Sequence, residues 1–526
     1  MRTATMRRAD PADGFAAAEA RLSGLVTRLR SADTARMSHS DLETLLEQQG
    51  RELMRQLLQA HLDLRAQATT TAPVVGADGV ERTHTRAGQR VLETLLGTVE
   101  VARAGYGARG HETLVPLDAA LNLPTERYSL GIRRRAAEEA TKGAFDETVQ
   151  ALTTQSGAHV AKRQVEEVVR RAAADFDAFY FARRLAWPAE TGVSSDVLVL
   201  TFDGKGVPMR VGDLRPATQA AALQREPKLA RRLTKGEKRH TKRIAQVAAV
   251  YTIAPFVRRA DDMLRELRPE AGVAPVRPRP EGKRVWASLV TSPTEVIEHA
   301  FLDASSRDVT RQKRWVVLVD GNTDQLARVT ATARRHRVAV TIVLDLIHVL
   351  EYLWTAAYVF HPEASPQAEA WVTERLLWLL CGDAGQVIAS IRRTATRRGL
   401  NAPERKPADR CAHYLERHKA YLRYDTYLAA GFPIATGVIE GACRYLVRDR
   451  MEITGARWSL QGAEAILRLR SLRASGDWEA YWRHHEQQEQ QRTHAARYAE
   501  GTIPALTPPV VAAPRKVKTP HLRVVK

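Results

Sequence analysis

The sequence predicts a mixed α/β fold that carries an all-helical insertion and follows a mostly helical N-terminal region. Three observations support this class. Five β-rich runs lie between 195 and 345, helical patterns separate the last three of them, and the stretches 129–180 and 346–430 are helical throughout. Strands followed by alternating helices and strands are typical of a mixed sheet with helices packed on it.

Composition limits the possible organisation and partners. The 526 residues suffice for about three or four folding units of roughly 150 residues each, and 44% of them are hydrophobic. The 80 Lys and Arg against 60 Asp and Glu leave a net charge of +20. This charge favours a polyanionic partner, nucleic acid before a membrane, and a merely soluble basic protein is the alternative.

Cysteine usage and hydropathy predict a cytoplasmic protein without membrane insertion. The three cysteines are far apart and form no Cys-x-x-Cys pair, which argues against a zinc knuckle or a disulfide framework. The start MRTATMRRADPADGF has no apolar segment behind it, and no run of 18 apolar residues occurs.

The first region, 1–89, is expected to contain an irregular tail up to about 38 and one amphipathic helix. Ser40 and Glu43 form a capping box, and leucines then recur at helical spacing to about Ala66. This helix packs on its own domain or pairs between two protomers. A loop to about 90 precedes the strand GTVEVARAGYG.

The second region, 90–194, is expected to bind DNA. KGAFDETVQALTTQSGAHVAKRQVEEVVRRA predicts two short amphipathic helices around a break at Ser156 and Gly157, with Lys162 and Arg163 at the start of the second helix. This is the spacing of a helix-turn-helix, although an ordinary helical hairpin is the alternative.

The third region, 195–345, gives the sheet. Its β-rich runs are VLVLTFDG (197–204), RIAQVAAVYTI (243–253), KRVWASLV (283–290), RWVVLVDG (314–321) and VAVTIVLD (338–345), with helices near 293–303 and 323–335. The order βββαβαβ, continued by a helix in 431–485 after the insertion 346–430, is the ribonuclease-H-like arrangement. A basic, Pro-containing tail, 486–526, ends the chain.

A basic segment, LQREPKLARRLTKGEKRHTKR (223–243), separates the first two strands. It is either a solvated loop or a track for a phosphate backbone. The basic residues that we expect to contact DNA here and at the preceding strand are Lys205, Arg231, Arg232, Lys235, Lys238 and Arg239.

Two aspartates follow the first and fourth strands and predict a metal site. Asp203 and Asp320 each precede a glycine, so a turn explains either of them alone. In a ribonuclease-H-like sheet these strands are neighbours, and two adjacent carboxylates need a cation. Oxygen ligands select Mg²⁺ or Mn²⁺, and a third acid would complete a site for two ions.

Glu440, in GVIEGACRYLVRDR, stands where the third acid is expected. A first-turn acid favoured by the helix dipole is the alternative. Arg444 and Arg448 follow one and two turns later, so we expect them to meet phosphates along the same helix face.

Five blocks resemble the DDE transposases of bacterial insertion sequences, most closely the ISKra-type branch, over roughly 90–485. They are TFDGKGVPMR, GEKRHTKRIAQVAAVYTI, VVLVDGNTDQL, VLDLIHVLEYLW and GVIEGACRYLVRDRMEITGARWS. The resemblance implies that Asp203, Asp320 and Glu440 form a metal-binding catalytic triad. Asp345 and His348 fall in the family's D-x-x-H-V block as possible accessory residues. From the residues alone, Asp345 is a helix N-cap and His348 a core or DNA-facing residue.

The activity that the resemblance implies is metal-dependent cleavage of double-stranded DNA at element ends, followed by strand transfer into target DNA by a homo-oligomer. A cysteine pair that relatives often carry near Tyr106 is replaced by GYGARGHE.

Other chemistries fit less well. A tyrosine recombinase would use His240 and Arg243, which lie in a basic loop, and a P-loop fails because Val199 replaces its first glycine. A glycosidase leaves the basic charge unexplained. A transposase-derived DNA-binding protein without cleavage, and a nuclease that never joins strands, remain the alternatives.

Overall fold

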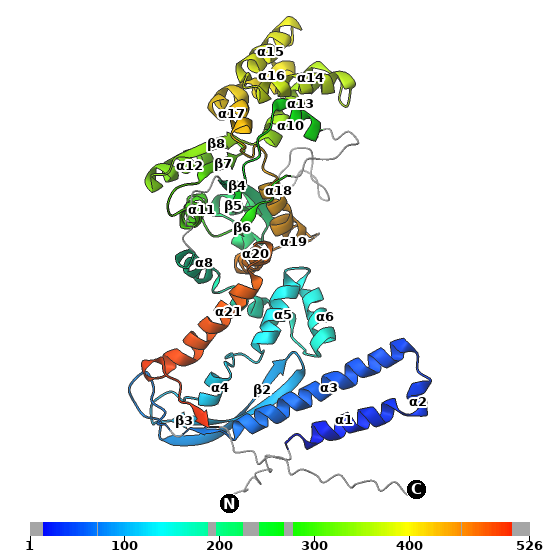
Figure 1. Cartoon of the computed structure of the whole chain (residues 1–526), viewed down its shortest axis with the longest axis vertical. Coiled ribbons are helices and arrows are strands. Elements are labelled where there is room, and N and C mark those ends of the chain that lie inside the picture. Colours follow the sequence, from blue (N-terminus) through cyan, green and yellow to red (C-terminus); the bar gives the residue numbers. More distant parts are fainter. Residues whose placement is uncertain are drawn as a thin grey trace, which may run out of the picture. The chain divides into compact units, whose positions relative to one another are not determined.

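The computed structural model describes residues 14–70, 72–187, 196–224, 241–267, 277–453 and 455–507. The chain forms two compact units (Figure 1). Unit 1 comprises 1–175 and 480–526, and unit 2 comprises 176–479. The division differs from the predicted boundaries after 194 and 485. Unit 2 begins at 176, before the first boundary, and the expected tail after 485 belongs to unit 1.

Unit 1 combines one long helix, α3, and several shorter helices with a long β-hairpin (Figure 1). β2 and β3 pair antiparallel over their full length, and β1 pairs with β9 near the end of the described chain. The elements are α1 (Ala16–Leu29), α2 (Ala32–Ala35), α3 (His39–Ala66), β1 (Thr69–Thr70), β2 (His84–Thr94), β3 (Gly97–Gly107), α4 (Pro116–Ala120), α5 (Leu130–Ala140), α6 (Phe145–Ser156), α7 (Lys162–Ala172), α21 (Trp478–Glu489, which begins in unit 2), η4 (Gln490–His494), η5 (Ala495–Arg497), η6 (Ala499–Gly501) and β9 (Leu506–Thr507).

Three expectations for the N-terminal region were wrong. Helices α1 and α2 replace the irregular tail. The N-cap of α3 is Ser38, whose hydroxyl accepts from the Asp41 amide at 3.2 Å, rather than Ser40. Strand β2 occupies part of the expected loop; its first six residues are all exposed, so it lacks the alternation that reveals a strand.

The predicted pair of short helices around Ser156 and Gly157 is confirmed as α6 and α7. Gly157 between them has φ +68°, a left-handed conformation that favours glycine at a helix end. The buried face of α7 consists of Val165, Val168, Val169 and Ala172. Lys162 and Arg163 lie on the exposed side of α7. Their contact with DNA stays a prediction.

Arg133 is the centre of a buried ionic cluster in unit 1. Its side chain is 1% exposed and forms ion pairs with Glu126 and, at 2.7 Å, with Glu489. Nη1 of Arg133 also donates to Nε2 of the fully buried His485 at 3.0 Å. Since guanidinium can only donate, His485 carries its proton on Nδ1. The cluster joins α5 to the C-terminal segment of the chain.

Asp175 continues this cluster. It accepts from Nδ1 of His485 at 2.6 Å and from Arg492 at 2.6 and 2.8 Å. Burial raises the pKa of Asp175, but the hydrogen bonds from His485 and Arg492 outweigh it and hold the pKa below the usual 3.8. Arg133 and Arg492 likewise hold the pKa of Glu489 below 4.5 against burial.

Unit 1 should therefore lose stability in acid. Carboxylates with lowered pKa values stabilise the folded state fully above their unfolded values, and this contribution disappears as the pH falls below about 4.5 through the lowered values. Asp175→Asn should be less stable than wild type at pH 7 and lose less on acidification. Urea unfolding monitored by hydrogen exchange in unit 1 measures this, with the exposed Asp63→Asn as control. Parallel pH curves for wild type and Asp175→Asn would contradict it.

Unit 2 contains a five-stranded sheet in the order β6-β5-β4-β7-β8. β4 is antiparallel to β5 and parallel to β7. This confirms the mixed α/β class and the prediction that the first and fourth strands of the region are neighbours. The elements up to the last strand are α8 (Phe176–Leu185), β4 (Val197–Pro208), η1 (Val211–Asp213), α9 (Pro216–Leu223), β5 (Lys242–Ile253), α10 (Ala260–Leu267), β6 (Glu281–Ser288), α11 (Pro293–Arg307), β7 (Arg314–Val319), α12 (Thr323–His336) and β8 (Val340–Leu344).

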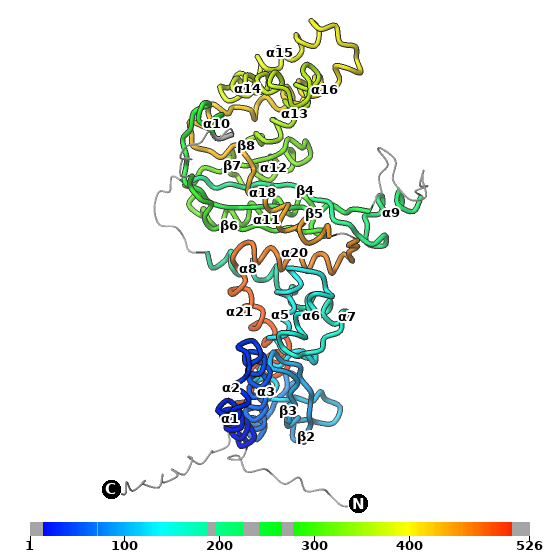
Figure 2. Tube along the Cα trace, turned by 90° about the vertical axis from the view of Figure 1, so that its right-hand side faces the viewer, coloured from blue at the N-terminus to red at the C-terminus, as the bar shows by residue number. Residues whose placement is uncertain are grey.

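β4 does not end at Asp203 as predicted. It continues to Pro208, paired with β5 as a two-stranded ribbon that runs beyond the other strands toward α9 (Figure 2). A Cβ on Gly204 or Gly206 would lie 2.9 Å from side-chain carbons of Ile244 or Lys242. These glycines therefore admit side chains of the paired strand rather than form a turn.

The predicted helical insertion is confirmed after β8. Its helices share a large apolar core with the sheet, and each fully buried Leu or Val in such a core contributes about 1.5–3 kcal/mol. Within 346–430 the elements are α13 (Leu346–Phe360), α14 (Pro366–Leu380), α15 (Ala384–Arg397), α16 (Ala402–Arg417), η2 (Lys419–Tyr421) and α17 (Tyr424–Ala429). After the insertion come α18 (Gly437–Ala442), η3 (Cys443–Arg448), α19 (Asp449–Met451) and α20 (Leu460–Ala474). Within the described residues, no helix is long and apolar enough to cross a membrane.

Candidate functional site

Asp203 stands in β4 immediately after a buried apolar run. The first five residues of the strand, 197–201, are 0% exposed, and Phe202 is 4% exposed. Oδ1 of Asp203 accepts from the Gly204 amide at 2.6 Å, and Oδ2 accepts from the Cys443 thiol at 3.1 Å. Burial, followed by the charge of Asp203, raises the pKa of Cys443, so Cys443 stays a neutral donor to this carboxylate.

Asp320 lies at the equivalent level of the neighbouring strand. Thr201 is paired with Leu318, and each aspartate follows its paired residue by two positions. Asp203 and Asp320 line one cavity of about 320 Å³, together with the amide side chains of Asn322 and Gln325. The parallel pairing thus brings together two carboxylates that are 117 residues apart in the sequence.

The turn after β7 also uses Asp320. Its Oδ1 accepts from the Asn322 amide at 2.8 Å, and its main-chain oxygen accepts from the Tyr414 hydroxyl at 2.8 Å. Gly321 has φ +87°, and a Cβ there would lie 3.0 Å from Leu344. The turn interpretation of Asp320 is therefore correct, and it leaves Oδ2 without a hydrogen bond to the described part of the chain.

Glu440 lies in α18 and is exposed. Partial loss of water around its carboxyl, then the charge of Asp345, raises the pKa of Glu440; Asp203 acts in the same direction and His348 opposes them. Glu440 is thus within electrostatic reach of Asp203, but it does not line the cavity of the two aspartates.

The three predicted acids do not form one closed ligand set. Among the residues that the structure describes, no three His, Cys, Asp or Glu side chains lie close enough together to hold a metal ion. Asp203 and Asp320 supply carboxylate oxygens in a cavity that is also lined by a third carboxylate, Asp324, by the amide side chains of Gln246, Asn322 and Gln325, and by Arg328. Carboxylate and amide oxygens suit Mg²⁺ or Mn²⁺. The residues fit such an ion through two carboxylates, whereas Glu440 does not take part in this arrangement.

Asp345 is confirmed as an N-cap and has a second structural role. It is 2% exposed and accepts from the Ile347 amide of α13 at 3.2 Å. It also accepts from the Thr436 amide at 3.1 Å and the Thr436 hydroxyl at 2.6 Å. Thr436 immediately precedes α18, so Asp345 fixes the start of the helix that carries Glu440. Nδ1 of His348 lies 3.8 Å from Asp345, and metal binding by either residue stays untested.

Removing the Thr436 hydroxyl should weaken this link. Burial raises the pKa of Asp345 against the hydrogen bonds from Thr436, so the carboxylate depends on those donors. Thr436→Val, which is nearly isosteric, should lower the free energy of unfolding by roughly 1–3 kcal/mol in urea. Thr436→Ser keeps the hydroxyl and serves as the control. Equal stability of the Val variant and wild type would show that the bond contributes nothing.

The helix after Glu440 differs from the prediction. Residues Cys443–Arg448 form a π-helical segment, η3, in which each turn is wider than in an α-helix. Arg444 and Arg448 therefore do not follow Glu440 at α-helical spacing. Both side chains are exposed, 78% and 66%, and each lies 3.9–4.0 Å from an acid, Asp449 or Glu452.

The other basic residues that we expect to contact DNA have varied surroundings. Lys162 forms an ion pair with Asp146 at 2.6 Å, Arg163 is exposed, and Lys205 is half-buried on β4. Contact of these residues with DNA stays a prediction. Five of the predicted contacts lie outside the described residues: Arg231, Arg232, Lys235, Lys238 and Arg239.

Sequence reasoning missed two residues of this region, Thr436 and Cys443. Thr436 could have been found, because threonine before a helix start is an N-cap signal. Nothing in the sequence connects Cys443 with Asp203, which lies 240 residues away. No protein-family model matches the chain, and no curated protein sequence matches it either.

Proposed function

We propose that this chain is a DDE-type transposase of the ISKra-type family, which cleaves DNA at the ends of an insertion sequence and transfers the strands to target DNA. The observation that carries the proposal is the shared cavity of Asp203 and Asp320. The sheet order, with the first and fourth strands of the region as neighbours, supports a ribonuclease-H-like core. The net charge of +20 suits a DNA substrate.

In this function, Asp203 and Asp320 would hold the divalent cation, which would supply Lewis-acid stabilisation of the phosphoryl transfer. Asn322 links the turn around Asp320 to α12. Its amide donates to Oδ1 of Asp320, and its side-chain oxygen accepts from the Asp324 amide at the start of α12. Cys443 orients one oxygen of Asp203.

The third carboxylate requires a change of position. Glu440 must approach the two aspartates when DNA binds, and the π-helical segment directly after α18 is a place where a helix can shift its register. Lys205, two residues after Asp203 on the same strand face, would contact phosphate.

The test is cleavage of DNA that carries the flanking ends of the native locus, with Mg²⁺ or with EDTA. Mg²⁺-dependent cleavage followed by joining to a target plasmid supports the proposal. Cleavage without joining indicates a nuclease of the same fold. A dimer or larger assembly on DNA is expected, and a strictly monomeric active complex in light scattering would contradict that part.

A DNA-binding protein derived from a transposase is the second candidate. It is favoured by one observation, the position of Glu440 outside the cavity of the aspartates. Specific binding to the correct ends without cleavage would establish this alternative.

A further inference from the structure

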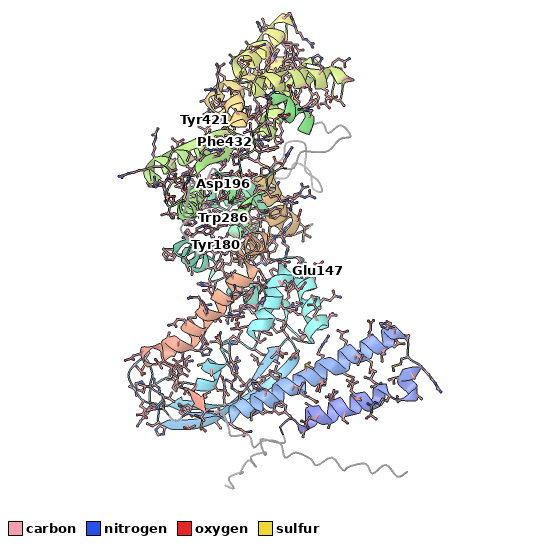
Figure 3. All side chains as sticks on the ribbon, in the orientation of Figure 1. Glu147, Tyr180, Asp196, Trp286, Tyr421 and Phe432 are labelled. Atoms are coloured by element: carbon pink, nitrogen blue, oxygen red, sulfur yellow. The ribbon has the colours of Figure 1, made fainter. Side chains whose placement is uncertain are left out.

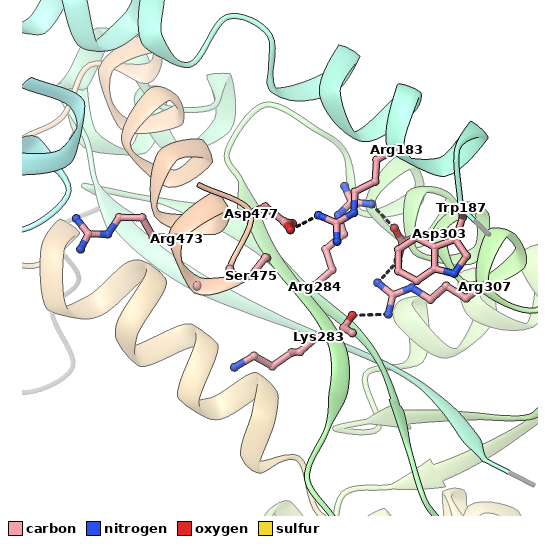
Figure 4. A pocket seen from close by; sticks show the side chains of 12 residues that line it. Arg183, Trp187, Lys283, Arg284, Asp303, Arg307, Arg473, Ser475 and Asp477 are labelled. Atoms are coloured by element: carbon pink, nitrogen blue, oxygen red, sulfur yellow. Dashed lines mark hydrogen bonds and ion pairs between the residues drawn. The ribbon is translucent and has the colours of Figure 1, made fainter. Parts of the chain in front are cut away.

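Unit 2 has a second cavity, shown in Figure 4, which neither Asp203 nor Asp320 lines. It has a volume of about 380 Å³ and lies between α8, the start of β6, the end of α11 and the turn that follows α20. β4 and β6 run in the same direction, since both are antiparallel to β5. The start of β6 is therefore at the opposite end of the sheet from Asp203, and the two cavities are separate.

The lining of this cavity has an excess of positive charge. Two acids, Asp303 and Asp477, contact Arg183, Arg284 and Arg307, whereas the charged ends of the other two basic lining residues, Lys283 and Arg473, point away from this group (Figure 4). The three arginines that meet the two acids thus leave a formal charge of +1, which an anionic ligand would balance. We call these seven residues the arginine pocket.

Two of the arginines are buried and share one acid. Arg284 and Arg307 are 5% and 4% exposed, and they contact Asp303 at 2.8 and 2.6 Å. Burial would raise the pKa of Asp303, but these two charges hold it below its usual value. One carboxylate thus balances two buried guanidinium groups. Charge of this kind is costly unless a further anion compensates it.

The same arginines keep unused donors. The Nε atoms of Arg284 and Arg307 are buried and have no hydrogen-bond partner among the described residues. Buried N–H groups without partners are uncommon and destabilising. Oδ2 of Asp303 also has no hydrogen-bond partner among the described residues, although it lies 2.6 Å from Nη2 of Arg307. The unused donors are an observation independent of the charge excess, and they favour an anionic ligand.

Aromatic rings hold the arginines in place. The guanidinium of Arg284 lies 3.8 Å from the ring centre of Tyr180 and 4.4 Å from that of Trp286, two residues labelled in Figure 3. Arg307 lies 4.9 Å from the ring of Trp187. Stacked guanidiniums lose little freedom when they bind, so they are ready for bidentate contact with phosphate oxygens.

We propose that the arginine pocket binds a phosphate group, either of a free nucleoside phosphate or of a nucleic acid strand. Phosphate oxygens can each accept from more than one guanidinium N–H, which matches the donors that Arg284 and Arg307 leave unused. This inference does not depend on metal chemistry at Asp203 and Asp320, and it can be tested with a chelator present.

The experiment is calorimetric titration of the full chain with pyrophosphate, ADP and a short DNA duplex, all in EDTA. The test variant is Arg183→Gln with Lys283→Gln, which removes two charges at the rim and leaves the buried arginines in place. The control is Arg393→Gln with Arg397→Gln, two exposed residues of α15, which gives the same change of net charge. Thermal unfolding checks that all proteins are folded.

We expect the rim variant to bind pyrophosphate at least about tenfold more weakly than wild type and the control to bind normally. Pocket-dependent binding of ADP identifies a free nucleotide as the source, whereas pocket-dependent binding of the duplex alone identifies a nucleic acid phosphate. No binding of any probe, or equal binding by the rim variant and the control, overturns the proposal and leaves the arginines a purely structural network.

Discussion

Asp320→Asn and Asp203→Asn should each reduce metal-dependent DNA cleavage by roughly a thousandfold or more while DNA binding persists. Asparagine has the same size and cannot carry the negative charge that holds a divalent cation. At position 320 it also keeps an oxygen that can accept from the Asn322 amide, so the turn after β7 stays intact. Cleavage is measured on gels at saturating DNA, and binding is measured by mobility shift.

The control for these variants is Asp261→Asn, an exposed aspartate of α10 outside the cavity, which should cleave normally. Glu440→Gln distinguishes a metal site of three carboxylates from a site of two. Loss of cleavage in this variant supports a triad that assembles on DNA. Full cleavage with Gln at 440, together with loss in both aspartate variants, would indicate a site of two carboxylates. Normal cleavage by Asp320→Asn would contradict the proposed site altogether.

Arg133→Met should destabilise unit 1 by about 3–5 kcal/mol, the usual effect of removing one member of a buried ion pair. The substitution leaves the carboxylates of Glu126 and Glu489 without this cation, and Nε2 of His485 loses its donor. Because two units can unfold separately, hydrogen exchange of α5 amides under increasing urea is the appropriate measurement.

Arg86→Met, on the exposed part of β2, is the control for Arg133→Met and should stay within about 0.5 kcal/mol of wild type. A loss below about 1 kcal/mol for the Arg133 variant would show that water or another group replaces the missing charge.

The sequence predicted those parts of the molecule that depend on local patterns. The five strands of the sheet are recognisable because each contains a β-rich, mostly apolar run; in β4, Val197–Phe202 is buried on both faces. The helices after β8 were recognisable from their spacing. Strand β2 was not, because its exposed half carries no pattern.

Contacts between distant segments could not be predicted from the residues. The bond between Thr436 and Asp345 spans 91 residues, and its two partners are ordinary cap residues when considered alone. The arginine pocket also combines residues from four separate elements. The adjacency of Asp203 and Asp320 was predictable only because the order of strands implied it. The position of Glu440 was not predictable, because the π-helical segment that follows it has no signal in the sequence.

Unit 1 is formed by two segments that lie far apart in the sequence, 1–175 and 480–526. The ribosome therefore completes unit 1 only after it has made unit 2. His485 follows Arg133 by 352 residues, so at 5–20 residues per second Arg133 waits roughly 20–70 s for this partner. All of 176–479 leaves the ribosome within that interval. Unit 2 can therefore complete its fold first, although unit 1 starts earlier, and a nascent chain that stops short of His485 gives Arg133 its partner Glu126 but neither His485 nor Glu489.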